Sequence, residues 1–268
     1  MTRPTHTPRT ALVTGASSGI GYQYARLLAE RGCDLVIVSN EKDRIERVAE
    51  ELRAAYGIEA TALYRDLAQR NAAEELFACC EGLGKQIDIL INNAGVFFFN
   101  DLTRAEMRRI ETMLDLHVRT TTLLCRRFGE AMKKRGYGYI LNMSSMSAWM
   151  PYPGIALYAA TKSYLKQFSA ALHDELLDDG VSVTAVCPGA VATDLYDLSD
   201  RYRRLALRLG IMMSPQKLAR KGLRAMFARK KRIVPGTINR IFVPLAGLLP
   251  SALVRLIKRK AKFYRYGE

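Results

Sequence analysis

Short apolar runs alternate with amphipathic stretches along roughly the first 190 residues of the chain. Apolar residues at helical spacing predict helices; in residues 42–56, Ile45, Val48, Ala49 and Leu52 share one face. Further helices are predicted over 22–32, 70–81, 103–135 and 158–177. The apolar runs between them have the length of β-strands and cover 11–13, 34–38, 60–67, 87–95, 137–145 and 181–189.

These apolar runs carry few polar residues, which indicates strands that are buried on both faces. Such strands are typical of a parallel sheet with helices packed on each side. Six of them alternating with helices predict an α/β fold, a Rossmann-type doubly wound parallel sheet. No internal repeat or low-complexity linker interrupts the chain, so we expect a single domain.

A glycine-rich segment, TGASSGIG, joins the first predicted strand to the first predicted helix. Gly15, Gly19 and Gly21 allow the backbone to approach a ligand closely, and the free N–H groups of a helix N-terminus attract an anion. Ser17 and Ser18 add hydroxyl donors. A tight turn without a ligand is the alternative, but the position after the first strand favours the phosphates of a dinucleotide.

Tyr158 and Lys162 lie four residues apart on a predicted helix and therefore share a face. A phenol with a pKa near ~10 is a poor acid–base group at neutral pH. Lowering that pKa to about 7 requires roughly 4 kcal/mol, which a nearby ammonium and a second positive charge supply in a partly dry site. Ser145 ends a predicted strand and is placed to hold a substrate oxygen, with Ser144 as the competing choice. A chance Tyr–Lys pair on a helix surface is the alternative interpretation.

Taken together, these motifs resemble those of the short-chain dehydrogenase/reductase family. The resemblance covers residues 10–195 and is carried by TGASSGIG, Asp66-Leu67, Asn92-Asn93-Ala94-Gly95, Ser145, Tyr158-x-x-x-Lys162 and Pro188-Gly189-x-x-x-Thr193, in that order. It implies hydride transfer between a nicotinamide and a carbonyl or secondary alcohol, with Ser145, Tyr158 and Lys162 as catalytic residues and Tyr158 passing the proton.

The same resemblance implies a set of cofactor contacts and no metal. Asp66 is expected near the adenine, Asn93, Ala94 and Gly95 near the adenosine ribose, and Val191 and Thr193 near the nicotinamide amide and a phosphate. The full set of expected cofactor residues is Gly15, Ser17, Ser18, Gly19, Ile20, Gly21, Asn40, Asp66, Leu67, Asn93, Ala94, Gly95, Tyr158, Lys162, Val191 and Thr193.

The sequence departs from the family pattern at two places. His117 occupies a helix position where many members carry an Asn that bonds a water of a proton relay, so His117 is a candidate relay residue. A buried or surface histidine without a catalytic role is the alternative. Ser39 stands where an acidic residue would select NAD, and Asn40 stands where reductases often have Arg. Glu41 opposes a 2′-phosphate and nearby basic residues favour one, so NADP(H) is predicted over NAD(H).

The formal net charge of +15 is concentrated at one end of the chain. Residues 200–268 hold 19 Lys and Arg with only Asp200 and Glu268, whereas residues 1–199 are slightly acidic. Residues 241–264 combine broken apolar runs with a basic stripe, which predicts peripheral contact with an anionic membrane. No base-reading or stacking module accompanies the charge, so nucleic acid is not expected as a partner.

We therefore expect residues 1–199 to form a dinucleotide-binding catalytic domain and residues 200–268 to form a substrate lid and a basic helical extension of it. The apolar stretch after Thr193 favours a lipid-like ketone, either a long-chain 3-oxo compound or a polycyclic one. A reductase of small polar carbonyls and a non-catalytic nucleotide-sensing scaffold are the alternatives.

The setting of the protein is predicted from composition and resemblance. The five cysteines lack paired spacing, which favours reduced thiols and a cytoplasmic location. Within the cytoplasm, the basic segment described above makes the cytoplasmic face of a membrane a candidate location. Neither a secretory signal nor a membrane-spanning run is apparent. The resemblance implies a homodimer or homotetramer.

Overall fold

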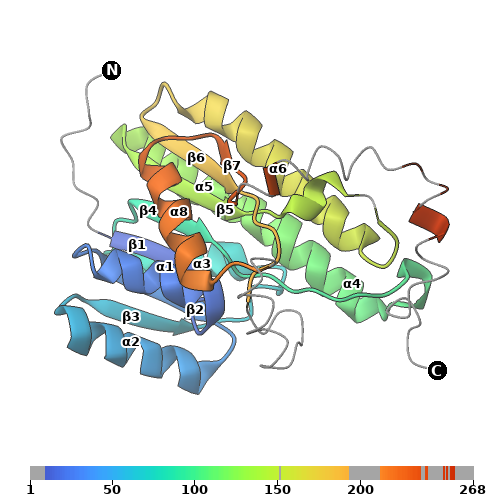
Figure 1. The fold of residues 1–268 in the computed structure, drawn as a ribbon. Helices are drawn as coiled ribbons and strands as arrows, with labels where there is room; N and C mark the ends of the chain where they lie inside the picture. Colours follow the sequence, from blue (N-terminus) through green and yellow to red (C-terminus); the bar gives the residue numbers. More distant parts are fainter. Residues whose placement is uncertain are drawn as a thin grey trace.

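A computed structural model describes residues 10–150, 152–192, 212–236, 239–240, 250, 252 and 254–256. The described chain forms one parallel sheet of seven strands in the order β3-β2-β1-β4-β5-β6-β7 (Figure 1). The strands are β1 (Thr10–Thr14), β2 (Asp34–Ser39), β3 (Ala60–Tyr64), β4 (Ile89–Asn92), β5 (Gly138–Met143), β6 (Val181–Val186) and β7 (Arg232–Ile233). The Rossmann-type doubly wound fold predicted from the sequence is thereby confirmed.

Helices cover both faces of this sheet. They are α1 (Gly19–Ala29), α2 (Lys42–Tyr56), α3 (Ala72–Gly82), α4 (Met107–Leu114), α5 (Thr121–Arg135), α6 (Ala156–Leu176) and α8 (Pro215–Phe227). A π-helical segment, Asp115–Thr120, joins α4 to α5, and short 3₁₀ turns cover Leu102–Arg104 and Met146–Trp149.

Alternate residues of each strand enter opposite halves of the core, because successive side chains of a strand point to opposite faces. Ala11 and Val13 pack with residues of α1, α2 and α8. Leu12, between them, packs with residues of α3, α5 and α6. This double burial explains why the strands read as continuous apolar runs in the sequence.

Two parts of the fold differ from the elements predicted by periodicity. The helix predicted over 103–135 is divided, because backbone hydrogen bonding widens to the π pattern at Asp115–Thr120. Residues beyond 200 add α8 and the edge strand β7, neither of which was predicted. Helix α8 has a clear start signal, since Ser214 accepts a hydrogen bond from the Lys217 N–H at 3.3 Å and is followed by Pro215.

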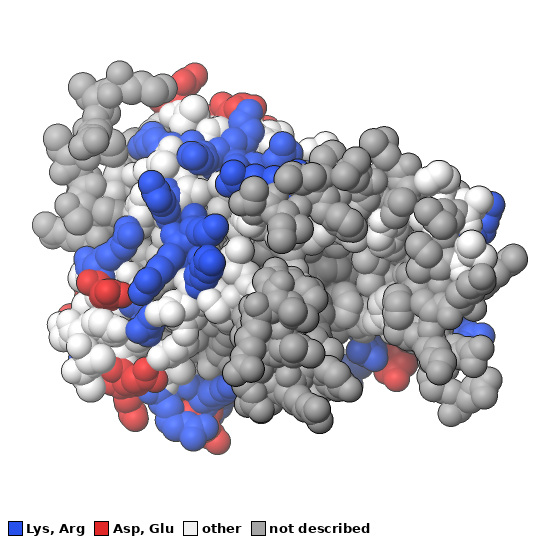
Figure 2. All heavy atoms as spheres, viewed as in Figure 1, with Lys and Arg blue, Asp and Glu red and all other residues white. Residues whose placement is uncertain are grey.

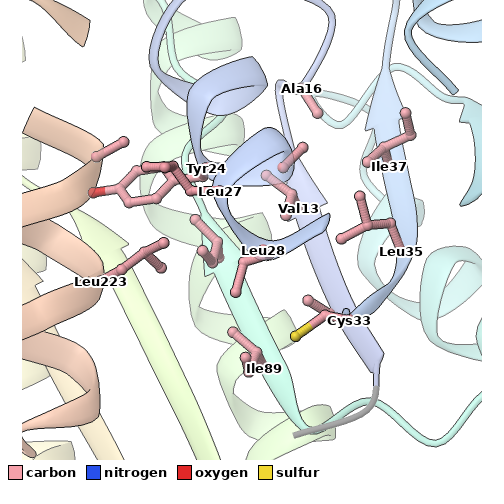
Figure 3. Packing of buried hydrophobic residues seen from close by; sticks show 14 of the residues in the cluster. Val13, Ala16, Tyr24, Leu27, Leu28, Cys33, Leu35, Ile37, Ile89 and Leu223 are labelled. Atoms are coloured by element: carbon pink, nitrogen blue, oxygen red, sulfur yellow. The ribbon is translucent and has the colours of Figure 1, made fainter. Parts of the chain in front are cut away.

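Helix α8 packs directly on α1, and this contact attaches the C-terminal part of the fold to the sheet (Figure 3). Leu223 of α8 lies beside Tyr24 and Leu27 of α1 in the core. Tyr24 is fully buried, and its hydroxyl lies 3.4 Å from the Met143 Sδ. The backbone of Gly222 packs so closely against the Tyr24 side chain that an added Cβ would lie 2.2 Å from the Tyr24 hydroxyl oxygen. The two helices therefore require glycine at position 222.

The expected segments beyond residue 240 lie almost entirely outside the described residues. This applies to the apolar and basic stretch 241–264, of which only a few residues are described. Within the part of the chain that the structure describes, no helix is both long enough and apolar enough to cross a bilayer.

Two glycine-to-alanine substitutions test the packing of α8. Gly222→Ala is expected to lower the free energy of unfolding by about 1–3 kcal/mol, because the methyl group overpacks the contact with Tyr24. Gly82→Ala is the control, because Gly82 ends α3 with no atom near its added Cβ, and it should raise that free energy by about 0.4–1 kcal/mol. Equal stability of both variants in chemical denaturation would contradict the close approach.

Candidate active site

A cleft of about 300 Å³ opens at the carboxyl ends of the central strands. Strands β1 and β4 are neighbours here, and the helices that follow them pack on opposite faces of the sheet. Ligands of doubly wound sheets bind at this kind of switch point. The cleft is lined by Gly15, Ser17, Ser18, Gly19, Ile20, Ser39, Asn40, Glu41, Arg65, Asp66, Leu67, Asn93, Ala94, Gly95, Val96, Leu116, His117, Met143, Ser144, Ser145, Tyr158, Lys162, Pro188, Gly189 and Val191.

The floor of the cleft is closed by hydrogen bonds between Thr14, at the end of β1, and the segment that follows β4. The Thr14 hydroxyl accepts from the N–H groups of Asn93 and Ala94, both at 3.0 Å, and donates to the Ile91 carbonyl at 3.2 Å. The Asn93 amide donates to the carbonyl oxygens of Thr14 at 3.0 Å and Gly15 at 3.2 Å. These bonds hold the glycine loop and the NNAG segment together.

The glycine loop is shaped to bring its backbone close to a ligand. Gly15 has a left-handed φ of 64°, and a Cβ on Gly21 would lie 2.0 Å from the Gly15 carbonyl oxygen. Helix α1 begins at Gly19 without a capping hydrogen bond from the Ser18 side chain. Its first N–H groups are therefore available to an anion, and the loop fits the phosphates of a dinucleotide.

A small polar network lies beside the glycine loop, at the end of β2. The Ser17 hydroxyl donates to Glu41 Oε2 at 2.6 Å, and the Ser39 hydroxyl donates to the Ser17 oxygen at 2.9 Å. The Arg44 guanidinium lies 3.4 Å from Glu41 Oε1. Glu41 thus presents a carboxylate to the cleft, with part of its charge offset by Arg44.

Arg65 reaches the same end of the cleft from the neighbouring strand. Its backbone N–H donates to the Ser39 carbonyl at 2.9 Å, directly after β3, and its exposed side chain lines the cleft near Asn40. Asp66 follows it, with a carboxylate that accepts from the Ala68 N–H at 3.0 Å and the Gln69 amide at 2.8 Å. This end of the cleft therefore holds one cation, Arg65, together with the carboxylates of Glu41 and Asp66.

Tyr158 and Lys162 face the cleft from the first turns of α6, and both are buried. The Lys162 Nζ donates to the Met143 carbonyl at 2.9 Å and lies 5.5 Å from the centre of the Tyr158 ring. Burial lowers the pKa of the Lys162 ammonium to about 8, and the nearby Cys187 thiol acts in the opposite direction. A buried ammonium beside a phenol favours the phenolate, which is the electrostatic condition for proton transfer.

The two serines at the end of β5 have different partners. Ser144 donates its hydroxyl to the Lys162 carbonyl at 2.7 Å. Ser145 accepts at its hydroxyl oxygen from the Ser147 N–H at 3.1 Å, which leaves the hydroxyl proton for another group. Both line the cleft, but Ser144 is turned toward α6.

His117 lies in the π-helical segment, and its imidazole is buried against the cleft. Its Nε2 is 3.0 Å from the Val96 N–H and therefore acts as the acceptor, which leaves the ring proton on Nδ1. Nδ1 lies 3.0 Å from the Thr161 hydroxyl, and that hydroxyl donates to the Tyr158 carbonyl at 2.9 Å. Burial, with a smaller contribution from Lys162, lowers the pKa of His117 well below its usual 6.5.

The structure brings the residues predicted from the sequence to one place. Nearly all of the predicted cofactor and catalytic residues that are described line the cleft. Gly21 lies behind the loop, against the Gly15 carbonyl, and Thr193 lies outside the described residues. The substrate lid expected after Thr193 also falls largely outside them, at residues 193–211.

An aromatic residue that the sequence analysis did not single out adjoins Tyr158. The ring of Phe97 meets that of Tyr158 edge to face, with 4.9 Å between the ring centres. Phe98, Val96 and Ile155 belong to the same apolar cluster. The signal was the run of three phenylalanines that follows NNAG after one valine, since ligands of doubly wound sheets bind next to the segments that follow the strands at the switch point.

Comparison with known proteins agrees with this geometry. A family model described as short chain dehydrogenase matches residues 9–202. The very-long-chain 3-oxoacyl-CoA reductase of Anas platyrhynchos is 33% identical over 195 residues, which are 70% of this chain and 62% of that protein. The chain thus matches less than two thirds of the length of this curated relative.

Two solved structures share the fold over nearly their whole length. A short-chain dehydrogenase from Sphingobium yanoikuyae in complex with NADPH superposes with a TM-score of 0.78 at 27% identity, covering 97% of this chain and 99% of that one. The bulky-bulky ketone specific alcohol dehydrogenase from Comamonas testosteroni gives a TM-score of 0.77 at 27% identity, with 98% of each chain covered. With its motifs gathered in one cleft and the family model spanning more than half of its length, the chain belongs to the short-chain dehydrogenase/reductase family, an oxidoreductase family whose fold binds NAD(P).

Proposed function

We propose that this protein reduces an apolar, lipid-like ketone to a secondary alcohol, with Tyr158 passing the proton to the substrate oxygen. A bound nicotinamide would supply the hydride. The observation that carries the proposal is the placement of Tyr158, whose ring centre lies 5.5 Å from the Lys162 ammonium and 4.9 Å from the ring centre of Phe97. An acid–base group at the border of a charged site and an apolar wall suits a carbonyl attached to a hydrocarbon body.

Lys162 has two roles in this proposal. Its ammonium lowers the free energy of the Tyr158 phenolate, since opposite charges attract strongly in a site with little water. Its hydrogen bond to the Met143 carbonyl holds the Nζ in position. This bond also compensates part of the cost of burying the charge, and no carboxylate is seen beside it in the described residues.

Ser145 is proposed to hold the substrate oxygen, and Ser144 to support α6. The hydroxyl proton of Ser144 is committed to the Lys162 carbonyl. The hydroxyl proton of Ser145 is free for a substrate oxygen, since its own oxygen is oriented by the Ser147 N–H. The partners of the two hydroxyls thus support the choice first made from spacing.

For His117 the geometry supports a positioning role. Both ring nitrogens have protein partners, so a water could bind the imidazole only by displacing one of them. The neutral ring links the segment after β4 to α6 and, through Thr161, to the Tyr158 carbonyl. We propose that this link fixes the position of the Tyr158 backbone relative to the segment after β4, and so the position of its side chain in the cleft. The relay role suggested by the sequence stays a prediction.

We keep NADP(H) as the proposed cofactor, with the two charges at the adenosine end as its determinants. Arg65 supplies a cation beside Asn40, where the sequence lacks the usual arginine. Glu41 opposes a 2′-phosphate, but its carboxylate is already bound by Ser17 and Arg44. The relative from Sphingobium yanoikuyae was solved with NADPH.

The assembly and location of the protein are proposals of the same kind. A homodimer or homotetramer, a cytoplasmic location and membrane contact through residues 241–264 follow from the sequence and the family resemblance. The residues of that segment lie largely outside the described ones.

A ketone screen tests the proposed reaction. The rate of NADPH or NADH oxidation is measured with each ketone. We expect a higher kcat/KM with a 3-oxoacyl thioester, 3-ketosphinganine or a ketosteroid than with a small diketone. Tyr158→Phe should lower kcat by a factor on the order of 10² to 10⁴, because the proton donor is removed. Tyr164→Phe, on the same helix but 37% exposed, should keep its activity. A preference for the diketone, or full activity of Tyr158→Phe, would refute the proposal.

Charge substitutions at the adenosine end test the cofactor assignment. Arg65→Gln should lower kcat/KM for NADPH about 10- to 150-fold and leave NADH little changed, since one charged hydrogen bond is worth about 1.5–3 kcal/mol. Glu41→Gln should raise kcat/KM for NADPH relative to NADH by a similar factor. A wild-type enzyme that prefers NADH, with no selective effect of Arg65→Gln, would rule out NADP(H).

The buried imidazole predicts a pH dependence of stability. The pKa of His117 is lowered in the folded state, so below about pH 6.5 the unfolded chain binds a proton that the folded chain does not. This contribution to stability is complete above pH 6.5 and falls on acidification by at most about 1.4 kcal/mol per pH unit. In His117→Asn the slope of unfolding free energy against pH, measured with denaturant, should be smaller. An unchanged slope would show that His117 is not buried as the neutral form.

A further inference from the structure

One face of α8 carries a row of positive charge. The buried side of this helix includes Leu218, Gly222 and Met226. The opposite, exposed side holds Lys217, Arg220, Lys221 and Arg224, which we call the α8 stripe. Their spacing of three and four residues places them in line along two turns. Residues 215–232 contain eight Lys and Arg and no Asp or Glu.

Three of these four charges do not stabilise the helix that carries them, and only Arg224 lies in the last turn, where the helix dipole favours a cation. Lys217 lies in the first turn, where the helix dipole favours an anion, and the turn has no acidic residue. Lys217 and Lys221, and likewise Arg220 and Arg224, are like-charged pairs four residues apart, which repel each other. The row therefore has a cost within the monomer, and a binding partner is the simplest reason for it.

Helix α5 provides an internal comparison, since it also exposes four cations. Each of these has a carboxylate partner: Arg126 with Glu130, Arg127 with Glu74 at 2.6 Å, Lys133 with Asp179 at 2.7 Å, and Lys134 with Glu130 at 3.1 Å. Among the residues that the structure describes, no member of the α8 stripe forms an ion pair. The α5 charges are neutralised within the protein, and the α8 charges are open to a partner.

The positive surface extends from α8 toward α1. A groove between the two helices is lined by Arg31, Arg220 and Arg224, with Leu27 and Phe227 as its apolar part and Glu30 as its one acidic residue. The Arg31 guanidinium lies over the Phe227 ring, 4.9 Å from its centre. Figure 2, drawn from the same side as Figure 1, shows Lys and Arg side chains gathered over α8, with acidic side chains toward the margins.

We propose that the α8 stripe docks on the surface of an anionic lipid bilayer. A layer of lipid phosphates and carboxylates neutralises a straight row of cations without a matching shape. A second copy of this chain fits poorly, because a symmetric contact would bring like charges together. Nucleic acid is less well matched, because no large apolar or aromatic side chain is exposed on α8 to stack on bases.

The proposed contact between α8 and the bilayer is confined to the lipid headgroups. The large apolar side chains of α8 face the core, so the helix has nothing to insert into the acyl region. Attachment through charge alone is expected to weaken strongly as salt rises. The proposal adds a rigid element to the membrane contact expected of residues 241–264, and it is independent of the reaction performed in the cleft.

Vesicle flotation of the full chain tests the α8 stripe. We expect the wild type to float with phosphatidylcholine vesicles that contain phosphatidylserine, and not with phosphatidylcholine alone. K217Q/R220Q/K221Q/R224Q should lower the partition coefficient on the order of a thousandfold, since each of the four basic residues near the surface contributes roughly 1 kcal/mol and about 1.4 kcal/mol is a factor of ten. The matched control R126Q/R127Q/K133Q/K134Q changes the net charge by the same amount on α5 and should reduce binding far less.

Three results would overturn the proposal. The wild type could show no preference for anionic vesicles, or could bind duplex DNA while leaving the vesicles unbound. The α8 and α5 variants could also lose binding equally, which would indicate a net-charge effect or binding by another segment. As a control, thermal melting of both variants is measured to check that each is folded. Turnover of a soluble ketone without vesicles is expected to be unchanged in the α8 variant, so failure of the docking proposal and failure of the proposed reaction are distinguishable.

Discussion

The site depends on one constraint, the attachment of the glycine loop to the segment that follows β4. Strands β1 and β4 are adjacent, yet the chain leaves them toward opposite faces of the sheet. The backbone at this split cannot continue the sheet ladder, so its polar groups need other partners. The Thr14 hydroxyl and the Asn93 amide supply them and span the gap. The cleft, the exposed helix N-terminus and the approach to Tyr158 all follow from this arrangement.

Around Tyr158 the protein uses buried polar groups that are held by the backbone. Lys162 is bonded to the Met143 carbonyl, Ser144 to the Lys162 carbonyl, and His117 to the Val96 N–H. Each bond ties a side chain to β5, to α6 or to the segment after β4, so that side chains from the end of β5, from α6 and from the π-helical segment keep fixed positions. Such preorganisation is what the proposed reaction requires, since charge would then develop on the substrate oxygen with little rearrangement of the site.

Charge is distributed unevenly over the rest of the molecule. On α5 the cations are paired with carboxylates, so that surface is close to neutral. On α8 the cations stand in a row on the face opposite the core. The candidate active-site cleft has the carboxylates of Glu41 and Asp66 and the cation of Arg65 along its lining, and it also contains the buried ammonium of Lys162. A net charge of +15 therefore describes no single surface of the protein.

The sequence by itself determined the order of elements and the parallel sheet, and it predicted residues that the structure places along one cleft, because apolar runs, glycine spacing and the Tyr–Lys pair are local signals. It did not reveal the π-helical break, since hydrogen bonding shifts there without a change in hydrophobic pattern. Only the tertiary structure decided that Ser144 donates to the Lys162 carbonyl whereas Ser145 accepts from the Ser147 N–H, that both nitrogens of His117 are bonded, and that the backbone of Arg65 pairs next to Asn40. These features depend on contacts between residues distant in the chain, where packing rather than local preference selects the partner.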